Sequence, residues 1–174
     1  MVERFISGGQ SGADQGALRA ARACGIPPGG WAPRGWLTEA GPSPWLADRG
    51  LVESQEGEAA AERYRARRRR CIADCEAVLL FGDITSPVGR GLIEDCRRNG
   101  KCWVWVKSGL TTPRHIADFI RESRVRVLMV AGNRESRQNR FLGIGHHLAT
   151  ADCEQGRTEC ETIQAGSGAL RGKP

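Results

Sequence analysis

A glycine-rich turn near the start of the chain carries the residues best suited to bind an anion. The short apolar run of residues 4–7 is followed by Gly8, Gly9, Gln10, Ser11, Gly12, Ala13 and Asp14. Glycines permit positive φ angles and let a ligand approach the backbone closely. When such a turn opens a helix, unpaired N–H groups converge on one place and favour a negative charge there. The segment therefore predicts a strand–loop–helix cradle for a phosphate; a purely structural turn is the alternative.

Two further polar segments that contain glycine follow other apolar runs. Residues 82–91 come after the run 77–81, and residues 131–136 come after the run 125–130. In open α/β sheets, ligands bind beyond the carboxyl ends of parallel strands, so we expect these segments to converge with the first turn. Their candidate ligand-binding residues are Ser86, Gly89, Arg90, Gly91, Asn133, Arg134, Glu135 and Ser136.

Residues 27–44 lack a helical or strand period and are crowded with Gly, Pro and Trp, which predicts a long ordered loop with a functional role. Trp31 offers a flat face for a heteroaromatic ring, and Arg34 offers a partner for phosphate or carboxylate. The alternative is that Trp31 and Trp36 simply cover the core.

The elements that must position these residues alternate along the chain. Apolar runs predict strands at 2–7, 77–81, 102–106 and 125–130, and helical patterns occupy 13–24, 58–75, 92–99 and a segment opened by Thr112 and Pro113. This alternation predicts a Rossmann-like α/β fold, a single domain with an open, mostly parallel sheet flanked by helices. We assign residues 1–150 to this domain and residues 151–174 to a C-terminal tail that we expect to be flexible.

Composition narrows the function classes. The 174 residues suffice for one core, and the net charge of +6 comes mainly from arginine, whose planar fork suits phosphate and carboxylate. No apolar run approaches the ~18 residues of a membrane span and no secretory leader pattern is visible, so we expect a cytoplasmic protein with no membrane partner. The seven cysteines are scattered and odd in number, which favours reduced thiols; no metal site is predicted.

Residues 63–70 form a strongly basic run, Arg-Tyr-Arg-Ala-Arg-Arg-Arg-Arg. Such a run suits either a nucleic-acid-binding patch or a solvated helix face. The acids in residues 53–62 offset its charge, and it has no interleaved aromatic set for stacking bases. A solvated face, which also suits a subunit contact, is favoured, and nucleic acid is not expected as a partner.

Residues 8–14, 25–35 and 130–136 together resemble the molybdenum cofactor carrier proteins. These are a branch of the Rossmann-like SLOG superfamily, which also contains the lysine-decarboxylase-like, cytokinin-activating phosphoribohydrolases. The resemblance covers roughly residues 2–150. It implies a fold that binds a phosphorylated pterin or nucleotide, as a homo-oligomer (dimer or tetramer). The chain departs from the pattern at Gly89-Arg90-Gly91, where a Gly-Gly-Thr or Gly-Gly-Ser element is usual, and at Asn133, where proline is more frequent.

The resemblance leads to a first hypothesis of a non-catalytic carrier for the molybdenum cofactor. The phosphate would lie on the amides of residues 8–12 with Arg90 or Arg134, and the pterin near Trp31. The second hypothesis is a phosphoribohydrolase-like enzyme that acts on a nucleoside monophosphate, with Glu94 as its acid/base. A third is a mononucleotide sensor without turnover. His115, His146 and His147 lie in predicted helical segments away from the glycine turns, so no Ser/His/Asp or Cys/His arrangement is supported.

Overall fold

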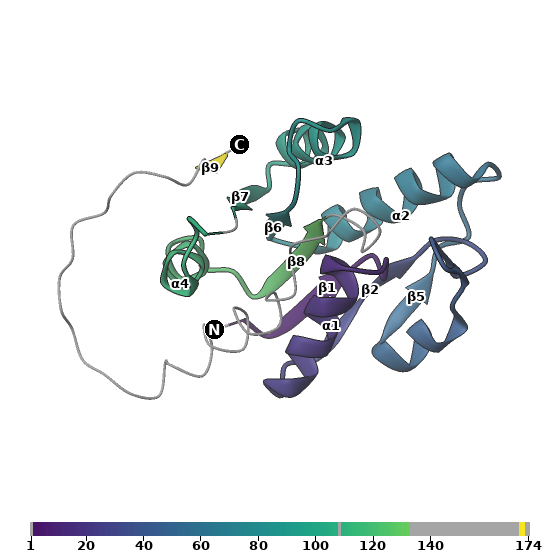
Figure 1. Cartoon of the computed structure of the whole chain (residues 1–174), viewed down its shortest axis with the longest axis horizontal. Coiled ribbons are helices and arrows are strands. Elements are labelled where there is room, and N and C mark those ends of the chain that lie inside the picture. Colours follow the sequence, from purple (N-terminus) through teal and green to yellow (C-terminus); the bar gives the residue numbers. More distant parts are fainter. Residues whose placement is uncertain (1, 108, 133–170, 173–174) are drawn as a thin grey trace, which may run out of the picture.

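The computed structural model describes residues 2–107, 109–132 and 171–172. Within these residues a seven-stranded sheet has the order β5-β2-β1-β8-β6-β7-β9, and all its neighbours are parallel except β7 and β9 (Figure 1). The strands are β1 (Arg4–Ser7), β2 (Pro28–Ala32), β5 (Leu51–Glu53), β6 (Ala77–Phe81), β7 (Cys102–Val106), β8 (Val127–Gly132) and β9 (Arg171–Gly172).

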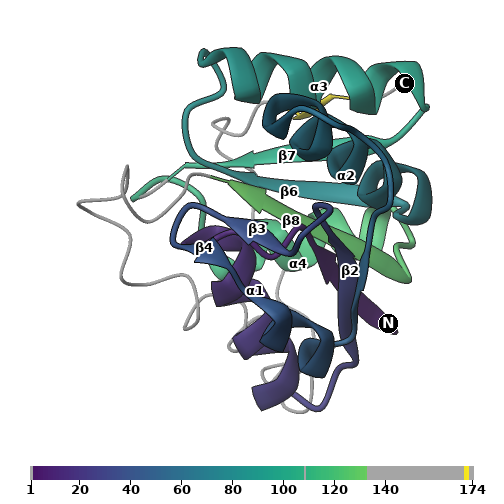
Figure 2. The same ribbon diagram turned by 90° about the vertical axis from the view of Figure 1, so that its right-hand side faces the viewer.

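Helices cover both faces of the sheet. Figure 2 shows α2 and α3 along one face and α1 and α4 along the other. The helices are α1 (Ala13–Ala23), α2 (Ala60–Asp74), α3 (Pro87–Arg98) and α4 (Pro113–Glu122), and the β3–β4 hairpin (Leu37–Thr38 and Gly41–Pro42) precedes a 3₁₀ helix (Pro44–Arg49). The predicted fold, a Rossmann-like open sheet flanked by helices, is confirmed.

The alternation of side chains in β6 explains the two cores. Leu79 and Phe81 pack with α1 and α4, whereas Val78 and Leu80 pack with α2 and α3. Every residue of β6 is buried, as expected for an apolar strand covered on both faces. This strand and β7 lie at the predicted positions, residue for residue.

The helix α3 begins earlier than the predicted range of 92–99. Ser86 is its N-cap, because the Ser86 Oγ accepts a hydrogen bond from the Gly89 N–H at 3.0 Å, and Pro87 occupies the first helical position. Residues 87–91 are therefore the first turn and a half of a helix rather than loop. The predicted start of α4 at Thr112 and Pro113 is confirmed, with a capping box between Thr112 and His115.

The prediction that residues 27–44 form a long ordered loop is wrong. This region contains β2 and the β3–β4 hairpin. The glycines of β2 disfavour a strand prediction, yet the strand requires one of them. Gly30 has φ of 120°, and a Cβ there would lie 2.1 Å from the Ser7 carbonyl oxygen. Close pairing with β1 thus selects the residue that a strand pattern disfavours.

The chain reverses its winding around β8, which lies between β1 and β6. From β1 it passes to α1 on one face, and from β6 it passes to α3 on the other. The crevice at such a reversal is the usual ligand site of an open α/β sheet. None of the helices in the part of the chain that the structure describes has the length and apolarity needed to cross a membrane.

Part of the predicted tail joins the sheet, since β9 pairs antiparallel with β7 through Trp103 and Gly172. The predicted domain boundary at residue 150 lies outside the described residues. The same holds for six residues singled out in the sequence: Asn133, Arg134, Glu135, Ser136, His146 and His147.

Candidate functional site

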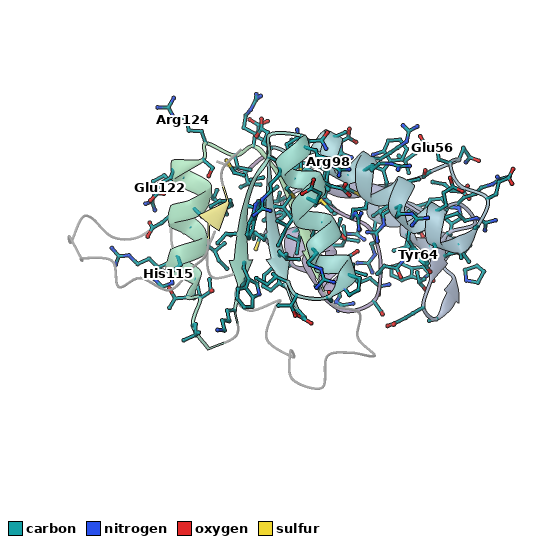
Figure 3. The ribbon with its side chains drawn as sticks, turned by 90° about the horizontal axis from the view of Figure 1, so that it is seen from above. Glu56, Tyr64, Arg98, His115, Glu122 and Arg124 are labelled. Carbon is teal, nitrogen blue, oxygen red and sulfur yellow. The ribbon has the colours of Figure 1, made fainter. Side chains whose placement is uncertain are left out.

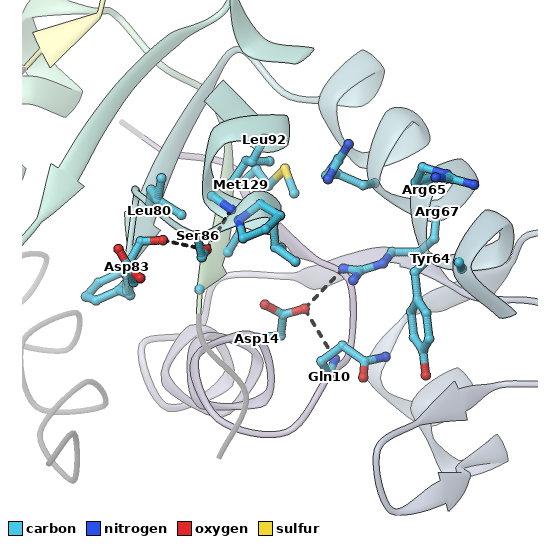
Figure 4. Close-up of a pocket in the computed structure, with 18 residues that line it drawn as sticks. Gln10, Asp14, Tyr64, Arg65, Arg67, Leu80, Asp83, Ser86, Leu92 and Met129 are labelled. Atoms are coloured by element: carbon cyan, nitrogen blue, oxygen red, sulfur yellow. Dashed lines mark hydrogen bonds and ion pairs between the residues drawn. The ribbon is translucent and has the colours of Figure 1, made fainter. Parts of the chain in front are cut away.

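A cavity of about 490 Å³ opens at the carboxyl ends of the central strands (Figure 4). Leu80 of β6 and Met129 and Ala131 of β8 form its floor, on the face of the sheet that α2 and α3 cover. Gln10 and Asp14 border it on the side of α1. The cavity therefore occupies the crevice where the chain reverses its winding.

One side of the cavity is an arginine wall, which we define as Arg65, Arg67 and Arg68 of α2. Arg67 Nη1 lies 3.2 Å from Asp14 Oδ2, and Arg68 Nε lies 2.7 Å from Asp95 Oδ2. Arg65 is exposed. The wall places three arginines along one side of the cavity, and guanidinium groups match phosphate and carboxylate geometry.

Asp14 is the most buried charged residue at the cavity, with 3% of its surface exposed. Its Oδ2 accepts a hydrogen bond from the Gln10 backbone N–H at 3.2 Å as well as from Arg67. Burial raises the pKa of Asp14 above its ordinary value, while the Arg67 guanidinium opposes that shift. The carboxylate thus joins the turn before α1 to α2, two elements on opposite faces of the sheet.

The first glycine loop (residues 8–12) is tied down by its own hydrogen bonds. The Gly9 N–H donates to Ser7 Oγ at 3.2 Å, and Gln10 Nε2 donates to the Leu37 carbonyl at 2.8 Å. The Ser11 hydroxyl donates to the carboxylate of Glu39 at the tip of the β3–β4 hairpin. The hairpin therefore fixes the side chains of two residues that the sequence assigned to ligand binding.

The start of α3 faces the arginine wall across the cavity. Ser86, Pro87 and Gly89 line the space, and Ser86 Oγ also donates to the Asp83 carbonyl at 2.8 Å. A hydrogen bond from the Thr85 hydroxyl lowers the pKa of Asp83. The first turn of a helix carries a partial positive charge, which favours an anion at this edge.

The structure brings only part of the predicted site to the cavity. Four predicted residues line it, namely Gln10, Asp14, Ser86 and Gly89. The neighbouring Gly8, Gly9, Ser11, Gly12, Arg90 and Gly91 are not among its lining residues. Arg90 instead donates through its Nη1 to the Thr85 carbonyl, within its own loop.

Trp31, Arg34 and Glu94 lie away from the cavity lining. Trp31 Nε1 donates to Asp74 Oδ2 at 2.6 Å, and the Arg70 guanidinium stacks 4.8 Å from the centre of a Trp31 ring. Arg34 is exposed after β2. Glu94 Oε1 accepts from Arg98 Nε at 2.9 Å on the outer side of α3. Trp31 is therefore held by α2 as a structural residue.

Sequence reasoning missed the contribution of α2. The expected solvated face is wrong for Arg67 and Arg68, whose side chains are only 12% and 19% exposed. The available signal was helical spacing, because Tyr64, Arg67, Arg68, Cys71 and Cys75 recur at intervals of three or four and share one face. Figure 3 shows Tyr64 on α2 and His115 on α4 at opposite ends of the molecule.

Comparison with known proteins agrees with this architecture. The crystal structure of a protein from Syntrophus aciditrophicus that bears the name "putative molybdenum carrier protein" matches with a TM-score of 0.73, over 87% of this chain and 94% of that one. At 24% sequence identity the likeness establishes the shared fold. No curated protein sequence matches the chain.

The sequence itself matches one family description. The model of the circularly permutated YpsA SLOG family covers residues 5–149, which include all three glycine-bearing segments and the whole arginine wall. The resemblance to the SLOG superfamily predicted from the three motif blocks is thereby confirmed. The chain belongs to the circularly permutated YpsA SLOG family.

Proposed function

We propose that the chain is a non-catalytic carrier that holds the molybdenum cofactor, a phosphorylated pterin, as cargo in the cavity between α1, α2 and α3. The observation that carries this proposal is the arginine wall, which faces the start of α3 across an apolar floor. The cofactor combines one phosphate with a flat ring system. The cavity offers a cationic surface for the phosphate and an apolar surface for the ring.

The cationic side of the cavity suits the phosphate. Two of the three guanidinium groups already pair with carboxylates, and Arg65 forms no ion pair within the described part of the chain. The N-terminal turn of α3 adds the partial positive charge of a helix start. The lining thus has a net positive character that favours an anionic ligand.

The floor of the cavity suits the ring. Leu80, Met129 and Ala131 present an apolar surface, and methionine sulfur packs favourably on aromatic systems. A volume of about 490 Å³ falls within the range of about 300–1,000 Å³ that small-molecule sites occupy. The name of the Syntrophus protein, a molybdenum carrier, supports the same choice of cargo.

The position of Glu94 favours binding over hydrolysis. The phosphoribohydrolase hypothesis assigns the acid/base role to this carboxylate, which pairs with Arg98 and does not line the cavity. The family resemblance further supports a homo-oligomer, dimer or tetramer, and we propose that it acts in the cytoplasm. A mononucleotide remains the alternative ligand, because it shares the phosphate and a flat ring.

The test is anaerobic native mass spectrometry of the protein incubated with molybdenum cofactor and purine mononucleotides. We expect the mass of the intact cofactor on each subunit, unchanged nucleotides, and an oligomeric ion. Retention of a nucleotide instead would identify a sensor, and release of free base with ribose phosphate would identify a hydrolase; either result contradicts the carrier.

A cavity variant sharpens the test. Ala131→Leu adds three carbons to the cavity floor and should reduce cofactor retention, because the added atoms take space that the ring needs. Leu110→Ala, which changes a residue that is 57% exposed and outside the lining, is the control and should retain the cofactor. Equal retention by both variants would place the cofactor elsewhere.

A further inference from the structure

We infer that the phosphate of the ligand lies on the arginine wall of α2 and not on the amides of the first glycine loop. The inference rests on the proposed function, since it assigns an orientation to the phosphorylated ligand in that cavity. It also gives the basic run at residues 63–70 a role that the sequence left open.

The chain's own carboxylates already occupy the first glycine loop. Asp14 accepts the Gln10 N–H and the Arg67 guanidinium, and a backbone hydrogen bond from Gly8 also acts on this carboxylate. On the opposite side of the loop, Glu39 accepts the Ser11 hydroxyl. A phosphate placed on this loop would meet two negative charges and would have to displace these bonds.

The arginine wall has the complementary arrangement. Arg65 lines the cavity, is exposed and forms no ion pair among residues 2–107 and 109–132. Arg68 is held by Asp95 but keeps further N–H donors on its guanidinium. Because Arg90 is turned back to the Thr85 carbonyl, Arg65 takes the phosphate-binding role that was predicted for Arg90.

A second observation points to a ligand donor at the loop. Gln10 lines the cavity and is 4% exposed, and its Nε2 is fixed by the Leu37 carbonyl. Its Oε1 has no hydrogen-bond partner in the described residues. A buried acceptor without a partner is uncommon and calls for a donor. A ring N–H or amino group supplies one, which places the ring toward the loop and the phosphate toward α2.

The experiment compares two probes that differ only by the phosphate. These are a pterin phosphorylated on its side chain and the same pterin after phosphatase treatment, titrated anaerobically by calorimetry. The phosphate ratio is the Kd of the dephosphorylated form divided by the Kd of the phosphorylated form. We expect a ratio of about ten or more in the wild type, as hydrogen bonds to a charged group give.

Two arginine variants on the same helix form the matched pair. Arg65→Gln should reduce the phosphate ratio by about tenfold, and Arg65→Lys should restore part of it, since the positive charge remains. Arg69→Gln removes the same charge from an exposed residue that does not line the cavity, and it should keep the wild-type ratio. Thermal melts of all variants confirm that each is folded.

The loop supplies the opposite test. Glu39→Gln should leave the phosphate ratio unchanged, whereas a ratio that rises would show that the phosphate lies beside this carboxylate and would overturn the inference. An Arg65→Gln variant with the wild-type ratio would overturn it as well. Equal binding of both probes by the wild type would exclude a phosphate site but keep pterin binding, and binding of neither would overturn the proposed function itself.

Discussion

The guanidinium of Arg67 lies directly over the α-carbon of Gly8. A Cβ at Gly8 would be 1.1 Å from Arg67 Nη1, so the two residues can occupy these positions only because residue 8 has no side chain. The same Nη1 then reaches Asp14 at 3.2 Å. Because Gly8 lacks a Cβ, Arg67 of α2 can pass over the first glycine loop and pair with Asp14.

Replacement of Gly8 by alanine should displace Arg67 and leave the buried Asp14 carboxylate without its cation. We expect a loss of about 1–3 kcal/mol in the free energy of unfolding, the usual cost of an unsatisfied buried polar group. Urea unfolding measures it. In an Arg67→Ala background the same Gly8→Ala change should cost much less, because the clash is absent; equal costs in both backgrounds would contradict this account.

Replacement of Trp31 by phenylalanine should lower stability without changing ligand affinity. The variant loses the hydrogen bond from Nε1 to Asp74, which we expect to cost about 1 kcal/mol. Thermal melts and pterin titrations measure the two effects. Asp74→Ala removes the same bond and should make a second change at Trp31 nearly neutral. A large loss of ligand affinity in Trp31→Phe would show instead that the indole contacts the ligand.

Glu76 should make stability depend on pH in the acid range. Its carboxylate accepts hydrogen bonds from the backbone N–H groups of Arg126 and Val127, the first being the main cause that lowers the pKa of Glu76 below 4.5. A lowered pKa in the folded state stabilises the protein above the unfolded pKa, and this stabilisation is lost as the pH falls through the folded value. The stability gap between wild type and Glu76→Gln should therefore close as the pH falls below about 4.5.

Urea unfolding at pH 7, 5 and 3.5 measures this gap. Glu58→Gln, a change at an exposed glutamate before α2, controls for the loss of one negative charge. A Glu76 gap that stays constant over this range would show that its bonds to the start of β8 are not formed by the ionised carboxylate.

The buried thiols should resist alkylation in the folded protein. Burial raises the pKa of Cys71 to about 11 and that of Cys75 and Cys96 to about 12, so little of the reactive thiolate forms at pH 8. Cys24 and Cys102 are partly exposed. Among the five cysteines in the described part of the chain, iodoacetamide followed by peptide mapping should find these two labelled first, and early labelling of Cys71 would indicate that α2 opens.

The central strands were predictable because they are apolar on both faces. Residues 77–81 and 102–106 have few polar atoms and no glycine, so burial alone determines their state. By contrast, β2 has the sequence Pro-Gly-Gly-Trp-Ala, and its pairing depends on the approach of Gly30 to the Ser7 backbone. That approach is a property of the assembled sheet, which local propensity does not encode.

The candidate site was predictable where backbone chemistry defines it and not where helix rotation does. The turn around Gln10 and the polar segment around Ser86 follow apolar runs and have recognisable residue types. In a run of arginines, however, the hydrophobic period that orients a helix is weak, so it is hard to predict that Arg67 turns inward while Arg69 faces solvent. Only Cys71 and Cys75 continue the row of buried residues and so indicate which side of α2 faces the sheet.

The place of β8 in the sheet has a consequence for synthesis on the ribosome. β1 with β2 and β5 forms one group of strands, and β6 with β7 forms another, and in the described structure these groups are joined only through β8. Because β8 is synthesised after both groups, each group has an unpaired edge strand until the ribosome has made more than 120 residues. Late closure of a sheet by distant contacts is slow and exposes edges that aggregate. Nascent chains stalled before residue 127 has left the exit tunnel should therefore bind chaperones. Chains stalled after residue 132 has left the tunnel should not.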